Sequence, residues 1–325
     1  MRRRDVLTFI ASAVAAAPLA AYADTYPSRP ITMVVPFPAG GATDVLARVL
    51  GERMKDILGQ PIVVENVGGA AGTIAVGRVA RTAADGYTLS IGTSTTHMLT
   101  GGLYDLQYNL LTDFDPIIMI GSEPLLIVTK KDFPANNLKE LIAWLKANPG
   151  KASVGIAGVG ATGHLAGIAF QKDTGTTFQF VPYRGNAPAM QDLAAGQIDF
   201  MMEPSSNFRS LVQGHLIKPI AITSPQRTAS YPDVPTVEEA GVPGFTASLW
   251  YGLWVRHGVP NDIIAKLNDT MRQTLADPAI QKRLGDLGVQ ITPASQQSPD
   301  DLRTFQKAEA DRWWPIIKAA NIPHQ

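Results

Sequence analysis

Two glycine-rich turns contain the residues of this chain that are best suited to bind a negatively charged group. The first comprises Phe37, Pro38, Ala39, Gly40 and Gly41, and Thr43 and Asp44 belong to the helix expected after it. The second runs from Gly158 to Gly163, includes Gly160, Ala161 and Thr162, and is followed by His164. A helix start leaves backbone N–H groups unpaired and carries the positive end of the helix dipole, so it attracts anions. Either turn alone is equally well explained as an ordinary connection, but the pair favours a site that grips a carboxylate from both sides of a cleft.

The second turn also permits an enzymatic interpretation. Gly158 to Gly163 spells G-x-G-x-x-G between an expected strand and an expected helix, which is the pattern of a dinucleotide-binding turn. The acidic residue that should follow at the end of the next strand is absent, and Tyr183 and Arg184 stand there instead. An arginine suits a 2′-phosphate, so an exported NADP-dependent oxidoreductase remains the alternative to a receptor.

Several single side chains are candidates for contacting a ligand, each with a structural alternative. Arg184 could pair with a carboxylate through two hydrogen bonds or form an ion pair on the surface. His164 could donate to an anion or face solvent, Glu203 could accept from a donor group or hold a loop, and Trp250 could line a cleft or pack in the core. The five histidines have no metal-ligand spacing, and no nucleophile elbow or phosphate-binding loop appears. We therefore expect no catalytic residue, no metal and no cofactor.

The first 23 residues are typical of an export signal. Arg2, Arg3 and Arg4 precede an apolar run that is too short to span a membrane, and Ala21-Tyr22-Ala23 is a suitable cleavage site. The clustered arginines fit a twin-arginine signal and a general secretory signal equally well. We expect residues 1–23 to be removed and the mature protein to work in the periplasm.

Composition limits the classes of partner. Removing residues 1–23 takes away three arginines and one aspartate, which leaves 25 basic and 27 acidic side chains. A slightly negative chain without a basic excess argues against a nucleic-acid partner or an anionic membrane surface. The chain has no cysteine, so its stability must come from its core. We expect no direct membrane insertion and a monomer.

Short strands, glycine turns and helices alternate along the chain, which predicts an α/β fold with a mostly parallel, doubly wound sheet in each of two lobes. The apolar segment 116–129 is expected to cross from the first lobe to the second, and 217–223 to serve as the return crossing. Residues 24–120 and 225–325 then form lobe 1, and residues 121–224 form lobe 2. A chain that passes twice between lobes makes a two-strand hinge over a cleft, as in type II-like periplasmic binding proteins.

A series of short motifs supports this interpretation. The chain resembles the Bug-type receptors, the solute-binding components of tripartite tricarboxylate transporters, over residues 26–322. The resemblance is carried by 26–31 (YPSRPI), 35–44 (VPFPAGGATD), 65–66 (EN), 85–87 (DGY), 163–167 (GHLAG), 181–188 (VPYRGNAP), 192–199 (DLAAGQID) and 231–241 (YPDVPTVEEAG). It implies a two-lobe fold that closes on a small carboxylate, which the turns 37–44 and 158–164 hold through backbone amides.

The chain departs from the family pattern at two places. Ile168-Ala169 stands where relatives usually carry an acidic side chain, and Met202-Glu203 replaces the usual aspartate after the strand that includes Phe200. We therefore expect a pocket of altered polarity, in which Arg184, His164, Ser94, Thr95 and Trp250 are candidates for recognising the rest of the ligand. A dicarboxylate, an aromatic acid and an amino acid all remain open as ligands, and either a membrane transporter or a signalling sensor remains open as the partner.

Overall fold

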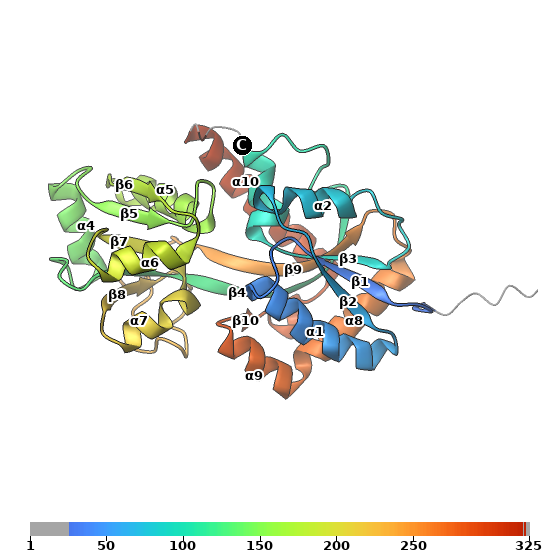
Figure 1. Ribbon diagram of the computed structural model, residues 1–325. Coiled ribbons are helices and arrows are strands. Elements are labelled where there is room, and N and C mark those ends of the chain that lie inside the picture. Colours follow the sequence, from blue (N-terminus) through green and yellow to red (C-terminus); the bar gives the residue numbers. More distant parts are fainter. Residues whose placement is uncertain (1–25, 321, 323–325) are drawn as a thin grey trace, which may run out of the picture.

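The computed structural model describes residues 26–320 and 322, which form two lobes joined by paired strands (Figure 1). Sheet A of lobe 1 contains β1 (Ile31–Val35), β2 (Ile62–Asn66), β3 (Thr88–Thr93), β9 (Ser248–Arg256) and β10 (Gln290–Ile291). Sheet B of lobe 2 contains β5 (Ser153–Ile156), β6 (Gln179–Pro182), β7 (Phe200–Pro204) and β8 (Ile217–Ile222). The long strand β4 (Phe114–Lys130) belongs to both sheets. The expected export signal, residues 1–23, lies outside the described residues.

The helices follow the strands in the alternating order that the sequence predicts. They are α1 (Ala42–Leu58), α2 (Thr73–Val79), α3 (Thr100–Leu103), α4 (Leu138–Ala147), α5 (Thr162–Thr174), α6 (Asn186–Ala194), α7 (Arg209–Gln213), α8 (Asn261–Ala276), α9 (Pro278–Asp286) and α10 (Pro299–Ala319). Short 3-10 turns occur at Ala70–Gly72, Ser205–Phe208 and Ala294–Gln296, and a π-helical turn at Thr95–Leu99. In the described part of the chain, no helix has the length and apolar content that a membrane span requires.

Both faces of sheet A are covered, which explains why its strands are apolar throughout. In β1, Ile31, Met33 and Val35 pack with residues of α1, α8 and α9, whereas Val34 on the opposite face packs with residues of α2 and α10. Parallel β1, β2 and β3 leave the carboxyl ends of β1 and β3 at the same edge of the sheet. This edge faces lobe 2 and supplies the lobe 1 side of the site described below.

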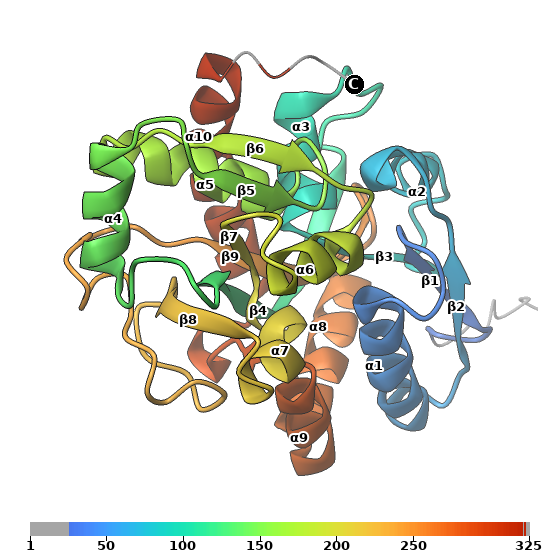
Figure 2. The ribbon, with the colours of Figure 1, turned by 60° about the vertical axis from the view of Figure 1, so that its left-hand side comes forward.

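Sheet B has a comparable arrangement, in which β5 lies between β6 and β7 and is parallel to both. Helices α4 and α5 pack on one face and α6 on the other. Turned by 60°, the molecule shows α1 to α3 in one lobe and α4 to α7 in the other (Figure 2). The predicted two-lobe α/β fold is confirmed.

The hinge is built from β4 and β9, which pair antiparallel from Phe114 to Pro124 of β4. Two irregularities in this pairing, at Ile117 and Ile120, mark bulges, and a bulge bends and twists a strand locally. Beyond Pro124, the buried hydroxyl of Thr223 donates to the backbone oxygens of Leu125 and Ala247 and holds the two crossing segments together. The hinge is therefore a hydrogen-bonded ribbon.

The return path differs from the sequence-based expectation. Strand β8, residues 217–222, pairs only with the lobe 2 half of β4, and the proline-rich segment after it stays on lobe 2. There, Thr236 forms a bridge with Ile222, and the Tyr231 hydroxyl donates to the Ser205 backbone oxygen at 2.7 Å. The expectation that residues 225–243 lie on lobe 1 is therefore wrong, since apolar Tyr231 and Val234 pack in the lobe 2 core. These contacts place the return crossing near Ala247. The other lobe boundaries stay a prediction.

Candidate ligand-binding site

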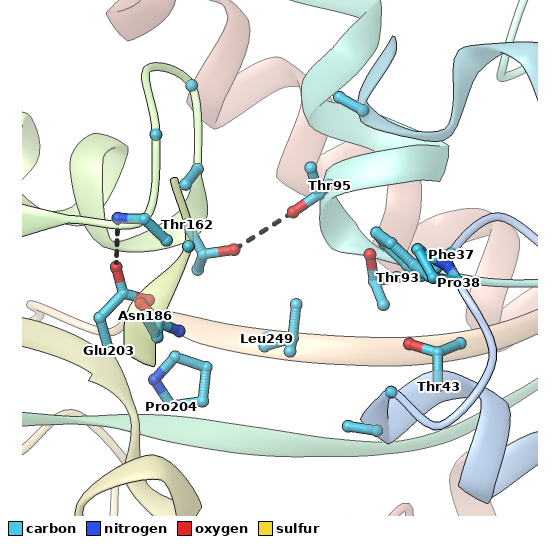
Figure 3. A pocket seen from close by; sticks show the side chains of 18 of the residues that line it. Phe37, Pro38, Thr43, Thr93, Thr95, Thr162, Asn186, Glu203, Pro204 and Leu249 are labelled. Carbon is cyan, nitrogen blue, oxygen red and sulfur yellow. Dashed lines mark hydrogen bonds between the residues drawn. The ribbon is translucent and has the colours of Figure 1, made fainter. Parts of the chain in front are cut away.

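A cavity of about 700 Å³ lies between the two lobes. From lobe 1 it is lined by Phe37, Pro38, Ala39, Gly41, Ala42, Thr43, Ala71, Thr93, Thr95, Leu103 and Tyr104. From lobe 2 it is lined by 157–162, Gly185, Asn186, Glu203 and Pro204, and Leu249 and Tyr251 of β9 complete it. Figure 3 shows these side chains converging from both sides. The volume suits a small organic molecule.

Three helices begin at this cavity, and none of their N-termini is capped by a side chain. Helix α1 follows Gly41, α5 follows Ala161 and α6 follows Gly185, and no side-chain hydrogen bond caps any of the three. Residues at all three starts line the cavity. Unpaired backbone N–H groups and the positive ends of three helix dipoles therefore surround the cavity and favour an anion.

Cationic side chains do not contribute to this preference. Among the described residues that line the cavity there is no lysine, arginine or histidine, and Glu203 is the single carboxyl group. Positive potential in the cavity comes from the main chain, which has a fixed geometry and does not titrate. The described residues also contain no group of three or more histidine or acidic side chains arranged to hold a metal ion.

Glu203 is the next-to-last residue of β7 and lies close to the turn that opens α5. Its side chain is only 2 % exposed, and its Oε1 accepts from the Ala157 backbone N–H at 3.4 Å. Burial raises the pKa of Glu203 to about 7, because the charged form loses its hydration, while the bonds from Ala157 and the Asn186 amide act in the opposite direction. A side chain on Gly163 would collide with this carboxyl group and with the Met202 carbonyl, so the close packing requires glycine there.

Asp44 holds the first turn in place. Its carboxylate accepts from the Gly40 backbone N–H at 2.8 Å and from the Asn66 amide at 3.0 Å, and Arg48 forms an ion pair with it. The hydrogen bond from Arg48 contributes most to lowering the pKa of Asp44 to about 2, so the carboxylate is ionised at any physiological pH. Asp44 and Gly40 bond to each other and do not line the cavity; the structure gives them a positioning role.

His164 holds the second turn in a comparable way. Its Nδ1 accepts from the Gly160 backbone N–H at 3.0 Å, and its ring packs edge-on against Phe180. Burial lowers the pKa of His164 to about 4, so the imidazole is neutral and Nδ1 stays available as an acceptor. His164 does not line the cavity in this structure, and that it donates to a ligand stays a prediction.

The two lobes touch directly at the mouth of the cavity. The hydroxyl groups of Thr95 and Thr162 lie 3.3 Å apart, as Figure 3 shows. Close by, a methyl group on Gly160 would meet Leu103 at 2.7 Å, so the second-lobe turn packs tightly against α3. Both contacts depend on the relative position of the lobes.

Comparison with known proteins identifies the family. The sequence pattern described as "Tripartite tricarboxylate transporter family receptor" matches residues 46–322. The chain belongs to this family. Protein BugT of Bordetella pertussis is 38% identical over 312 residues, which cover 95% of this chain and 94% of BugT.

Solved structures agree with this assignment. The periplasmic binding protein BugD is 38% identical, with a TM-score of 0.77 over 92% of this chain and 100% of BugD. MatC from Rhodopseudomonas palustris, solved with bound malate, is 35% identical, with a TM-score of 0.77 over 90% of this chain and 100% of MatC. An R. palustris protein solved with adipate is 34% identical, with a TM-score of 0.78 over 92% of this chain and 99% of that protein. Both of these relatives therefore hold dicarboxylates.

The receptor brings together most of the residues that its sequence singled out. Phe37, Pro38, Ala39, Gly41, Thr43, Thr95, Gly160, Ala161, Thr162 and Glu203 line one cavity. Ser94 is buried between two lining residues, with no partner for its Oγ in the described structure, and does not line the cavity itself. That any of these residues contacts a ligand stays a prediction.

Three other candidates point elsewhere. Trp250 is 0 % exposed and packs against Trp254 and Phe305 in the core. The Tyr183 hydroxyl donates to Asp192 at 2.7 Å, and Arg184, which is exposed, precedes the lining residue Gly185. None of the three lines the cavity, so this receptor offers a ligand no arginine there.

Sequence reasoning missed several lining residues. Leu249 is one of them: because neighbours in a strand face opposite sides, the burial of Trp250 turns Leu249, and with it Tyr251, towards the cavity. Asn186 opens α6 after Gly185, and this third glycine-led helix start was a signal that the sequence did contain. Ala71, Thr93, Leu103 and Tyr104 carry no local signal and reach the cavity through tertiary packing.

Proposed function

We propose that this protein is a periplasmic receptor that captures a small carboxylate between its lobes and delivers it to a membrane transporter. The observation that carries the proposal is the convergence of three uncapped helix starts on one cavity without a cationic side chain. The dicarboxylates held by two relatives support the ligand class. The family description names a transporter receptor, which supports delivery to a transporter over a signalling sensor.

Hinged closure provides the mechanism. A ligand favours the closed form only through contacts that the open form lacks, and a carboxylate between α1 and α5 would accept hydrogen bonds from both lobes at once. The same closure brings Thr95 against Thr162 and excludes water from the cavity. No catalytic group is required, and Arg184, the residue that keeps the NADP alternative open, does not line the cavity.

A thermal-shift screen of residues 24–325 against monocarboxylates, dicarboxylates, amino acids and NADP tests the proposal. A ligand at one hundred times its dissociation constant should stabilise the protein by about 2.7 kcal/mol. Stabilisation by a carboxylate and not by NADP supports the receptor; stabilisation by NADP alone would replace it with the oxidoreductase.

An engineered acid provides a matched control. Exposed Ala42 lies in the first turn of α1 at the cavity, so the Ala42→Asp variant should cap the helix and repel a ligand carboxylate. Exposed Ala279 occupies the first turn of α9, away from the cavity, and Ala279→Asp should leave binding intact. Retained carboxylate binding by Ala42→Asp would contradict the assignment of the anion site.

A further inference from the structure

The lobe 2 wall of the cavity presents hydrogen-bond acceptors that lack partners. The Oδ1 atom of Asn186 is buried without a hydrogen-bond partner in the described structure. The Glu203 carboxyl lies beside it, is 2 % exposed, and accepts from the Ala157 backbone N–H at 3.4 Å and from the Asn186 amide, which leaves part of its acceptor capacity unused. Figure 3 shows the Asn186 and Glu203 side chains together next to Pro204. Leaving buried acceptors unsatisfied costs about 1–3 kcal/mol each, so this wall should be completed by a ligand.

The lobe 1 wall of the cavity does not distinguish ligand donors from ligand acceptors. The Thr93 hydroxyl of lobe 1 is also buried without a partner, but a hydroxyl can donate or accept. The remaining surroundings are largely apolar, with Leu249, Leu103 and Ala71 facing the cavity. A ligand body between the two polar ends therefore contacts hydrocarbon.

A second carboxylate on the ligand would be poorly accommodated. An ionised carboxylate only accepts hydrogen bonds, and the unsatisfied side-chain oxygens on the lobe 2 wall, Asn186 Oδ1 and ionised Glu203, are acceptors as well. The donors of this wall are the backbone N–H groups at the starts of α5 and α6, which the first carboxylate occupies. No cationic side chain among the described residues lines the cavity. Two negative groups near each other in a water-poor cavity repel strongly, since the effective dielectric constant is low.

We propose that this receptor selects a ligand with one carboxylate and, at its other end, a hydrogen-bond donor that Glu203 and Asn186 accept. The carboxylate occupies the helix starts, and the donor is a hydroxyl, amino or amide group. This inference rests on the proposed function. It makes Glu203 the residue that separates this chain's ligand from a dicarboxylate such as the malate or adipate held by its relatives.

The titration of Glu203 predicts how the ligand preference should change with pH. Its pKa of about 7 means that its ionised fraction grows between pH 6 and pH 8. An ionised Glu203 accepts from a donor more strongly and repels a carboxylate more strongly. The elements packed against Glu203 place the Asn186 side chain and the backbone of Ala157 and Gly163 around its carboxyl group. His164 on α5 stays neutral in this pH range, and the Tyr183 hydroxyl is hydrogen-bonded to Asp192. Preference for the donor-bearing ligand should therefore increase with pH.

Matched ligand sets test the inference by isothermal titration calorimetry. We would use a four-carbon chain, a six-carbon chain and a benzoate ring, each with a hydrogen, a hydroxyl, an amino group or a second carboxylate at the far end. On every scaffold that binds, the hydroxyl or amino member should bind at least tenfold more tightly than the dicarboxylate, and more tightly than the unsubstituted acid. Comparison of hydroxyl and amino members identifies which donor is preferred.

A variant separates the role of Glu203 from general effects of cavity shape. Glu203→Gln keeps the size of the side chain and supplies an amide donor, so the preference against the dicarboxylate should fall at least tenfold and lose its pH dependence. Exposed Glu238→Gln serves as the control and should behave as the wild type. An unchanged preference in Glu203→Gln would overturn the assignment to Glu203.

The possible failures are distinguishable. A dicarboxylate that binds as tightly as, or more tightly than, its donor-bearing counterpart overturns the inference and leaves the carboxylate receptor standing. Equal binding of unsubstituted and donor-bearing acids also overturns it. If no acid on any scaffold binds, the proposed function itself fails.

Discussion

Replacing Glu203 with glutamine should stabilise the ligand-free protein at high pH, although it removes no apolar contact. The folded state raises the pKa of Glu203 from 4.5 to about 7, so it binds the proton more tightly than the unfolded chain does. The stability from this group is complete below pH 4.5 and is lost as the pH rises to about 7. Each pKa unit corresponds to about 1.4 kcal/mol, so roughly 2–3 kcal/mol disappears between pH 5 and pH 8.

Glutamine does not titrate, so the Glu203→Gln variant should gain roughly 2–3 kcal/mol of stability over wild type between pH 5 and pH 8. At the upper pH this is a rise of about 5 °C in melting temperature, on the usual scale for chains of this size. The assay is urea unfolding at pH 5, 6, 7 and 8 on protein refolded from denaturant, which removes any ligand that co-purifies. Taking the difference in unfolding free energy between variant and wild type cancels the contributions of the other titrating groups. The exposed Glu238→Gln substitution is the matched control. A difference that does not vary with pH would refute the reasoning.

Three further predictions concern the two turns. Gly163→Ala places a methyl group against the Glu203 carboxyl and should destabilise the protein by about 1–3 kcal/mol in urea unfolding, with loss of ligand binding; near-wild-type stability would contradict the packing. Thr95→Val removes the contact with Thr162 and should weaken carboxylate binding about two- to tenfold in calorimetry, whereas unchanged affinity would show that the contact does not favour closure. The folded state lowers the pKa of His164 from 6.5 to about 4, so stability should be lost as the pH falls through this range, and His164→Gln should lessen that loss; equal acid sensitivity of wild type and variant would count against it.

The parts of the fold and site that depend on local chemistry could be predicted from the sequence. Apolar runs followed by glycine turns and amphipathic helices indicated the two sheets, and the turns 37–43 and 158–162 do line one cavity. The reasoning succeeded because a glycine-led helix start has the same geometry and dipole wherever it occurs. The same reasoning applied to Gly185 would have found Asn186 as well.

The sequence could not show which face of a strand is turned towards the cavity, or on which lobe a connecting segment lies. Period-two alternation in β9 shows that Trp250 and Tyr251 face opposite sides, but not which of the two sides is the cavity; in the structure Tyr251 lines it and Trp250 is buried in the core. Asp44 and His164 were correctly placed at the turns, yet their partners, the Gly40 and Gly160 backbone N–H groups, give them structural roles. The return crossing was missed because apolar residues near 231–234 fit the core of either lobe equally well.

The hinge ribbon has a consequence for how motion can be observed. Because β4 and β9 remain paired across the bulges at Ile117 and Ile120, the lobes can only approach by twisting a ladder whose bonds stay intact. Backbone amides of these strands should therefore exchange slowly with deuterium whether or not the cavity is filled. Amides at the starts of α1, α5 and α6 have no such protection, so their exchange should slow only when a ligand accepts their hydrogen bonds. Hydrogen exchange would thus report occupancy at the helix starts separately from the opening and closing of the lobes.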